Sequence, residues 1–339
     1  MQNRSATSID KQLRNGTARQ TTMEAAVISQ AGKFELRQAP LPEPAARQVR
    51  IKIEGCGLCA SNIPPWEGRE WFEYPFAPGA PGHEGWGTVD KTGENVQGLK
   101  PGDRVAALTY HAFAEYDLAD DTSVVKLPRK LRGEPFPAEP LACAMNILHR
   151  SRIWPGETVA IVGTGFLGQL LVQLAVAEGA KVIALSRRQS SLAMAAKNGA
   201  EKTIELKDHY QIIDEVKRYT KGHFCDCVIE CTGKEWPLNL AGELTKERGR
   251  LVVAGFHQDG MRQVNMQLWN WRGLDVINAH ERDPKQYIRG MKAAIKAVEE
   301  GRMNPRPLFT HFFRKKDIQQ AFEMHRKKPD GFVKALVLF

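Results

Sequence analysis

The sequence predicts an α/β protein with a doubly wound parallel sheet and a second, separate domain. Three observations support this prediction. The chain has 339 residues, of which 42% are hydrophobic, which is enough for two cores. From residue 157 onward, short apolar runs alternate with helical stretches, as in a parallel sheet. A glycine cluster, GTGFLG, lies between the first of these runs and the helical stretch after it.

The composition narrows the possible classes of function. The net charge of +9 comes from 48 Lys and Arg against 39 Asp and Glu, without long like-charge blocks. This argues against nucleic acid and favours anionic small molecules as partners. No run reaches the ~18 apolar residues of a membrane span. Six cysteines are too few for a disulfide framework, so we expect a reducing compartment, by default the cytoplasm.

The first 22 residues are polar and contain no apolar segment of the kind found in secretory signals. Their Arg and Ser content faintly resembles a transit peptide. We favour a disordered extension over residues 1–22, because EAAVIS, directly after Met23, is the first run typical of a strand.

The segment from Glu157 to Arg188 predicts a βαβ unit that binds a dinucleotide. Gly163, Gly165 and Gly168 form GxGxxG at the junction between strand and helix. Glycine there permits a tight turn, a close approach to a pyrophosphate and close packing of helix on strand. The free N–H groups of the helix then face the anion.

The end of the second strand predicts the type of cofactor. NAD enzymes usually place an acidic residue there, whereas this chain has Ser186, Arg187 and Arg188. A hydroxyl followed by two guanidinium groups can bind the extra phosphate of NADP, so we predict NADP(H) over NAD(H). The alternative is a solvated basic turn without a ligand.

Further strands are expected at 226–231, 249–255 and 274–279, with helices near 209–219 and 235–246. Three cysteines, Cys225, Cys227 and Cys231, lie in and beside the first of these strands. Because alternate strand residues share a face, we expect all three on one face as a cluster of core thiols.

The stretch GCGLCASN places Cys56 and Cys59 three positions apart. This spacing is compatible with half of a zinc knuckle, a redox pair, or one working cysteine beside a bystander. A second Cys or His pair and a helix N-terminus are both missing from the flanking sequence, which favours the third interpretation, with Cys56 packed in a core.

Seven segments resemble the zinc-dependent medium-chain alcohol dehydrogenases. The matches cover residues 23 to 339 and are, in order, GLCASN (57–62), GHEGWGTV (82–89), GDRVAAL (102–108), FAEY (113–116), EPLACA (139–144), GTGFLG (163–168) and the C-terminal GFVKALVLF. The resemblance implies a GroES-like, mainly β catalytic domain over 23–150, completed by 281–339. A Rossmann domain over 151–280 would bind the cofactor, with the active site in the cleft between the two.

The resemblance also assigns roles to individual residues. Cys59 and His83 match zinc ligands, and Glu84 matches a carboxylate that binds or adjoins the zinc. Glu139 takes the place of the remaining ligand, as in the sorbitol-type enzymes. Ser61 matches the hydroxyl that accepts the proton of the alcohol, and the remaining assignments are to the cofactor: Gly163, Gly165, Phe166, Leu167, Gly168 and Lys334.

The resemblance implies that zinc polarises the substrate oxygen while hydride passes to or from the nicotinamide. Three departures from the family's pattern limit the assignment of these roles to this chain. Pro64 stands where many members have the histidine that ends the proton relay, and Asn62 stands where aspartate is usual. Residues 102–127 contain no cysteine. We therefore expect one catalytic zinc per chain and no structural zinc.

The leading hypothesis is a zinc-dependent oxidoreductase that uses NADP(H) and a secondary alcohol or polyol, or the matching carbonyl compound. The alternatives are a zinc-free quinone or enoyl reductase and a protein that binds NADPH without turnover. A homo-oligomer, dimer or tetramer, is expected from the resemblance. Aromatic residues could form a substrate wall or simply pack: Trp66, Trp71, Phe72, Tyr74, Phe76, Trp269 and Trp271.

Overall fold

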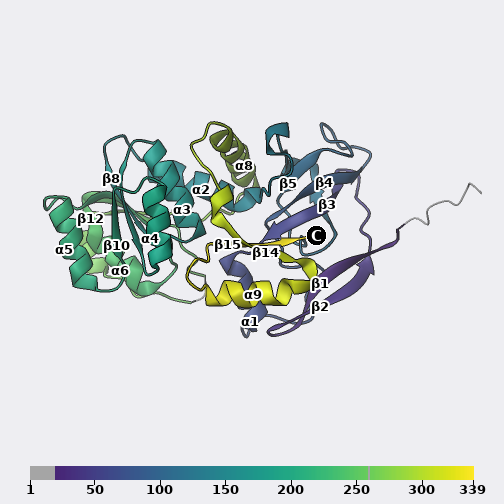
Figure 1. Ribbon diagram of the computed structural model, residues 1–339, viewed down its shortest axis with the longest axis horizontal. Coiled ribbons are helices and arrows are strands. Elements are labelled where there is room, and N and C mark those ends of the chain that lie inside the picture. Colours follow the sequence, from purple (N-terminus) through teal and green to yellow (C-terminus); the bar gives the residue numbers. More distant parts are fainter. Residues whose placement is uncertain (1–19, 259) are drawn as a thin grey trace, which may run out of the picture.

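The computed structural model describes residues 20–258 and 260–339 and shows two lobes side by side (Figure 1). One lobe is built on a parallel sheet with helices, and the other on a mixed sheet. The extension predicted over residues 1–22 lies, apart from its last three residues, outside the described residues. Strand β1 begins at Thr22, close to the predicted start of folding.

The parallel sheet has six strands in the order β10-β9-β8-β11-β12-β13. The strand order reverses between β8 and β11, which confirms the predicted doubly wound arrangement. The strands are β8 (Thr158–Val162), β9 (Lys181–Ser186), β10 (Lys202–Glu205), β11 (Cys225–Glu230), β12 (Thr245–Val253) and β13 (Asp275–Asn278). The helices of this lobe are α3 (Phe166–Ala177), α4 (Gln189–Lys197), α5 (His209–Tyr219), α6 (Glu235–Leu244) and α7 (Met266–Trp271).

The cysteines of β11 do not share one face, so this prediction was wrong. Cys225 packs in the apolar cluster on one side of the sheet, whereas Cys227 and Cys231 pack on the other. The pairing of β11 with β12 shifts register between Cys225 and Cys227. Such an irregularity breaks the two-residue alternation on which the prediction rested.

The mixed sheet joins C-terminal strands to strands from the first part of the chain. Its order is β14-β15-β3-β4-β5-β7, with β6 also paired to β3. The strands are β3 (Gln48–Gly57), β4 (Gly85–Thr92), β5 (Arg104–Ala107), β6 (Tyr116–Asp120), β7 (Val124–Lys126), β14 (Phe309–Arg314) and β15 (Lys334–Leu338). Strand β15 pairs antiparallel with β3, which places Val337 opposite Cys56. A hairpin of β1 (Thr22–Gln30) and β2 (Lys33–Pro40) completes this lobe.

Helices α2 (Ala138–Ser151) and α8 (Pro284–Glu299) lie between the two sheets in Figure 1. The mixed-sheet lobe also contains α1 (Ile63–Glu67) and α9 (Ile318–Lys327). Within the described residues, none of these helices is long and apolar enough to cross a membrane.

Candidate active site

Cys59, His83 and Glu84 come together as a possible metal centre. One ligand atom from each, a sulfur, a ring nitrogen and a carboxylate oxygen, lie within 4.8 Å of one another. Among residues 20–258 and 260–339, no other three His, Cys, Asp or Glu side chains lie close enough together to hold a metal ion. Thiolate, imidazole and carboxylate are the donors that zinc prefers, so these residues fit a zinc ion.

Asn62 holds this centre in shape. It ends a short 3-10 helix, η1 (Ala60–Asn62), and its Oδ1 accepts a hydrogen bond of 2.8 Å from the backbone N–H of Cys59. Its Nδ2 donates to the carbonyl oxygen of Pro81 at 2.9 Å. That carbonyl also lies 3.0 Å from Nδ1 of His83. A carbonyl can only accept, so Nδ1 carries a proton, and Nε2 is the ring nitrogen that could bind a metal after losing its own proton.

We expect Asn62→Ala to weaken the metal centre without removing a ligand. The loss of two buried hydrogen bonds should lower the free energy of unfolding by about 1–3 kcal/mol. It should also lower zinc affinity by about 10–100-fold, because the support behind Cys59 and His83 is gone. Urea unfolding and competition with a chelator measure the two effects.

A matched control is Asn239→Ala. Asn239 also makes hydrogen bonds with both ends of its amide, to the backbone of Gln263 and Asn265, but it lies in α6 of the other lobe. This variant should lose stability and keep its zinc affinity. Equal zinc affinity in both variants would contradict the role of Asn62.

Without a metal, the charges of the centre favour a protonated His83 beside a Cys59 thiolate, so metal binding would have to release a proton from His83. Burial alone would lower the pKa of His83, but its hydrogen bond with Cys59 and nearby negative charges raise the pKa to about 10. Burial opposes ionisation of Cys59, yet the same hydrogen bond with His83 lowers its pKa. The thiol is therefore biased toward the thiolate, the form that binds zinc.

Glu139 stands apart from the group of three. It lies in the first turn of α2, and its Oε1 accepts a hydrogen bond of 3.4 Å from the thiol of Cys143. Burial raises the pKa of Glu139, although the charge of His83 opposes this rise. The charge of Glu139 also raises the pKa of His83, so this carboxylate acts on the centre although it is not one of the three donors within 4.8 Å of one another.

Lys334 lies beside the metal centre. Its buried ammonium donates to Oε1 of Glu84 at 2.7 Å and to the carbonyl of Leu58 at 2.8 Å. It also lies 4.8 Å from the ring centre of Phe166, the first residue of α3. Lys334 therefore connects Glu84 with the beginning of the helix that follows the glycine loop.

The residues of the GCGLCASN stretch have different surroundings in the structure. Cys56 lies in β3 and is fully buried in the core, as expected. Ser61 is half-buried in η1, and its hydroxyl has no hydrogen-bond partner among the described residues. A helix N-terminus was not expected here, yet Cys59 is the N-cap of η1, and Pro64 lies in α1 directly after it. Two consecutive prolines, which suit the first turn of a helix, are the signal that the prediction overlooked.

The glycine loop fits a dinucleotide. Gly163 has φ +99°, and a Cβ on Gly168 would lie 2.1 Å from the carbonyl oxygen of Gly163, so neither position tolerates a side chain. A Cβ on Gly165 would meet open space. The buried hydroxyl of Thr164 has no hydrogen-bond partner among the described residues, which leaves it free to bind a phosphate.

The segment after β9 contains one anchored and one free arginine. Arg188 donates from Nη1 to the carbonyl oxygen of Phe332 at 2.5 Å, and its backbone N–H lies 3.4 Å from the hydroxyl of Ser186. Arg187 is exposed, and its guanidinium makes no hydrogen bond or ion pair within the described chain. Arg187 is therefore the side chain available to an incoming anion.

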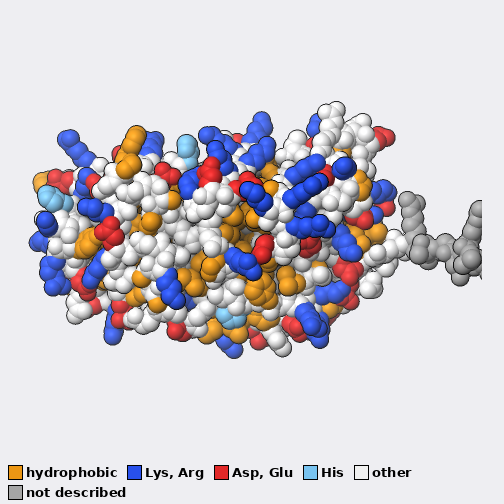
Figure 2. Space-filling view, turned by 45° about the horizontal axis from the view of Figure 1, so that its top comes forward, with side chains coloured by type: hydrophobic (Ala, Val, Ile, Leu, Met, Phe, Trp, Pro, Cys, Tyr) orange, Lys and Arg blue, Asp and Glu red, His pale blue; other side chains and the backbone are white. Residues whose placement is uncertain are grey.

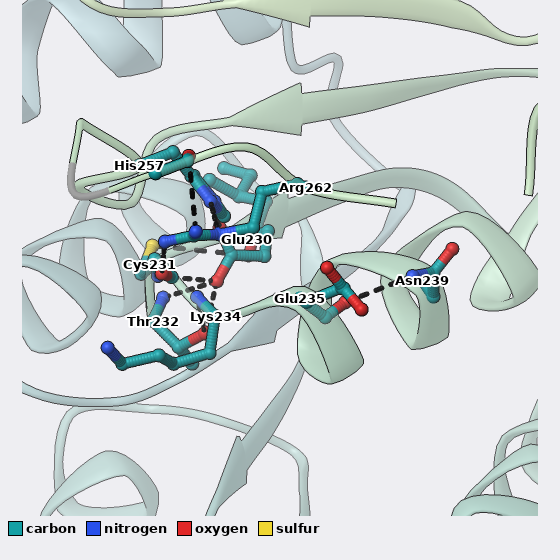
Figure 3. A network of polar contacts seen from close by, with 11 residues as sticks. Glu230, Cys231, Thr232, Lys234, Glu235, Asn239, His257 and Arg262 are labelled. Atoms are coloured by element: carbon teal, nitrogen blue, oxygen red, sulfur yellow. Dashed lines mark hydrogen bonds and ion pairs between the residues drawn. The ribbon is translucent and has the colours of Figure 1, made fainter. Parts of the chain in front are cut away.

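A buried polar network at the end of β11 was missed by sequence reasoning. Figure 3 shows Glu230 surrounded by donors: its Oε1 accepts from the N–H of Gly233 at 2.9 Å, and its Oε2 lies 2.8 Å from Nε2 of His257. Arg262 donates from Nε to Nδ1 of His257 at 3.2 Å. Because Arg can only donate, Nδ1 is the acceptor and Nε2 carries the proton toward Glu230.

This network reaches the glycine loop. The hydroxyl of Thr232 donates to Glu230, and a Cβ on Gly163 would lie 2.5 Å from Cγ2 of Thr232. The turn after β11 is therefore packed against the glycine loop. An acidic residue at the carboxyl end of a buried parallel strand is the sequence signal that could have identified it.

The aromatic residues are mainly packing residues. Trp66 is buried against Phe322 of α9, and Trp269 is buried in the core of the parallel-sheet lobe. In the 71–76 segment, Trp71 contacts Phe72, and Phe76 contacts both Phe72 and Tyr74. Trp71 is exposed. Packing thus accounts for Trp66 and Trp269, and no substrate wall follows from them.

Comparison with known proteins places these features in a family. A family model described as "Alcohol dehydrogenase GroES-like domain" matches residues 45–129, and one described as "Zinc-binding dehydrogenase" matches residues 167–298. An alcohol dehydrogenase of Rhizobium meliloti is 32% identical, over 84% of this chain and 98% of that protein. A sorbitol dehydrogenase of Halalkalibacterium halodurans is 27% identical, over 93% of this chain and 99% of that protein.

A solved structure supports the same conclusion. A protein of Sinorhizobium meliloti 1021, described as a zinc-binding dehydrogenase bound to NADP, superposes with a TM-score of 0.79 at 25% identity. The match covers 94% of this chain and 100% of that chain. With the GroES-like and Rossmann-like lobes and the Cys59–His83–Glu84 group, these matches show that the chain belongs to the zinc-binding medium-chain alcohol dehydrogenase family.

Proposed function

We propose that this protein transfers hydride between NADP(H) and a secondary alcohol or polyol, or the corresponding carbonyl compound. The observation that supports this most is the thiol, imidazole and carboxylate group of Cys59, His83 and Glu84. The similarity to sorbitol dehydrogenases and the presence of Glu139 favour polyols. A zinc ion at this group supplies Lewis acidity toward the substrate oxygen, and the nicotinamide accepts or donates the hydride.

The protein's own residues have separate tasks in this proposal. Cys59 and His83 hold the metal, Glu84 is kept in place by Lys334, and Glu139 supplies a further carboxylate. The free hydroxyl of Ser61 takes the proton of the alcohol. Pro64 has no proton to exchange, so water continues the relay. We propose one zinc per chain and no structural zinc.

The proposed preference for NADP rests on the end of β9. Ser186 offers a hydroxyl, and the unpaired Arg187 offers a guanidinium that can bind a 2′-phosphate in a bidentate manner. Arg188, held by Phe332, adds positive charge and fixes the turn. Gly163, Gly165, Phe166, Leu167 and Gly168 bind the pyrophosphate in this proposal. We also propose the division into a catalytic part, 23–150 with 281–339, and a cofactor part, 151–280.

A coenzyme-coupled screen in both directions tests the function. Polyols, inositols and aliphatic and aromatic alcohols, with the matching carbonyl compounds, are assayed with the wild type and with Cys59→Ser, and zinc is quantified in both. Zinc-dependent turnover of at least one class, absent in Cys59→Ser, supports the proposal. Turnover of quinones or enoyl compounds by zinc-free protein would instead indicate a reductase. Zinc-loaded protein without any activity would indicate a binding protein.

We propose that the chain forms a homo-oligomer through the exposed edge strand β13. No described strand pairs with the outer edge of β13, and its residue Val276 is 44% exposed. Trp271 and Met266 of the preceding helix are 85% and 60% exposed. An open edge flanked by exposed apolar side chains favours pairing with a second copy, and a two-fold axis closes such an assembly.

We expect Val276→Lys together with Trp271→Lys to shift the protein toward monomers, as measured by light scattering during gel filtration. The two charges would have to be buried in the proposed interface. The control is Trp154→Lys, since Trp154 is 66% exposed in the loop after α2 and far from this edge in sequence. An unchanged mass for the β13 variant would refute this interface.

A further inference from the structure

A second pocket lies between α2 and α8, away from the metal centre. It has a volume of about 360 Å³, and it is closed on one side by Glu178 at the end of α3. Glu139 is in the first turn of α2, whereas the pocket lies against the second half of this helix. At 1.5 Å per residue, His149 lies about 15 Å further along the helix axis than Glu139.

The two helices approach each other closely beside this pocket. At Gly290 they are so close that a Cβ would lie 2.9 Å from the carbonyl oxygen of Ala142. Beyond this contact, one face of each helix lines the pocket. The apolar floor consists of Met145, Leu148, Ile153, Gly290 and Ala293.

The polar part of the pocket is cationic. Arg152, Arg289, Arg302 and His149 line it, against one acid, Glu178. Arg302 already pairs with Glu178 at 3.6 Å and with Glu300 at 2.9 Å. The guanidinium groups of Arg152 and Arg289 make no hydrogen bond or ion pair with any residue in the described part of the chain. Two exposed guanidinium groups thus line one pocket without an acidic partner in the described chain.

A purely structural role explains only part of this arrangement. Cations at the end of α2 interact favourably with the helix dipole, which accounts for His149 and Arg152. Arg289 lies inside α8, away from its C-terminus, and gains nothing from that dipole. Figure 2, in which the top of Figure 1 comes forward, shows Lys and Arg side chains gathered in the upper middle of this face.

We propose that this pocket binds a small organic molecule that carries a phosphate group. Two guanidinium groups match a phosphate monoester, which has a charge of about −2 at neutral pH and can accept bidentate hydrogen bonds. The apolar floor binds the organic body of the ligand, which an inorganic ion lacks. The volume lies at the lower end of the range for small-molecule sites, about 300–1,000 Å³. This site is separate from the cofactor cleft and from the metal centre.

Isothermal titration calorimetry on the cofactor-free full chain tests the site, with phenyl phosphate as the probe. The wild type is compared with Arg152→Gln combined with Arg289→Gln. The matched control is Lys285→Gln combined with Lys292→Gln, which removes the same charge from exposed positions of α8 that do not line the pocket. Binding at the cofactor cleft would persist in both double variants, so it cannot imitate the expected result.

The expected result is saturable binding to the wild type, about tenfold or more weaker binding to the arginine variant, and a change below about twofold in the control. Inorganic phosphate should bind the wild type more weakly than phenyl phosphate. The proposal is overturned if the wild type shows no saturable binding, or if both double variants bind as tightly as the wild type. It is also overturned if the control loses affinity as much as the arginine variant.

Discussion

Replacing Cys59 by alanine is expected to remove zinc from the purified protein and to lower kcat/KM by about a thousandfold or more. Cys59 supplies the thiolate of the three-residue group, and His83 and Glu84 alone provide too few donors. Without the metal, the polarisation of the substrate oxygen is lost, which is worth several kcal/mol of transition-state stabilisation. Atomic emission spectroscopy gives the zinc content, and the coenzyme-coupled assay gives the rate.

Cys56→Ala is the matched control for this experiment. Cys56 is three residues away and fully buried in the core, where its thiol meets Glu84 at the backbone and donates to the carbonyl oxygen of Gly57 at 3.4 Å. It should retain zinc and activity and lose at most about 1 kcal/mol of stability from the small cavity. Full zinc stoichiometry in Cys59→Ala would exclude Cys59 as a ligand.

Replacing Ser186 by aspartate should lower the ratio of kcat/KM for NADP to that for NAD by about 100-fold. Ser186 is buried at the carboxyl end of β9, so a carboxylate there would face the 2′-phosphate with little solvent between them. The same carboxylate can accept hydrogen bonds from the ribose of NAD. Arg187→Ala should weaken the use of NADP by about tenfold and leave NAD nearly unaffected.

Lys181→Ala is the control for these coenzyme variants. Lys181 is an exposed cation at the opposite end of the same strand, so its loss changes the net charge by one without touching the cofactor cleft. The coenzyme ratio should stay at the wild-type value. If Ser186→Asp and Arg187→Ala also left the ratio unchanged, the proposed preference for NADP would be wrong.

Local sequence patterns predicted correctly those features that depend on residues close together in the chain. The alternation of strands and helices after Glu157 and the spacing of Gly163, Gly165 and Gly168 are confirmed as the parallel sheet and its first turn. The faces of Cys225 and Cys227 were mispredicted because a change of register is set by the neighbouring strand. Periodicity within one strand contains no such information.

Long-range contacts account for what the sequence did not reveal. Glu230 and His257 are 27 positions apart and meet because β11 and β12 are neighbours in the sheet. In the sequence, Asn62 differs from the usual aspartate only by the loss of a negative charge. In the structure its amide donates a hydrogen bond to the carbonyl oxygen of Pro81, which an aspartate carboxylate cannot do. Lys334 was assigned to the cofactor phosphates, and its contact with Glu84 spans 250 positions.

The hydrogen bond from Arg188 to Phe332 joins two parts of the active cleft through a short piece of backbone. Phe332 is two residues before Lys334, the partner of Glu84, and Lys334 begins the strand that pairs with the strand of Cys56. A displacement at the turn of Arg188, to which we assign coenzyme recognition, can therefore reach Glu84 through three residues. In the proposed function, selectivity for the coenzyme and geometry at the metal thus depend on one connected segment, so substitutions made to change the first should be checked for effects on the second.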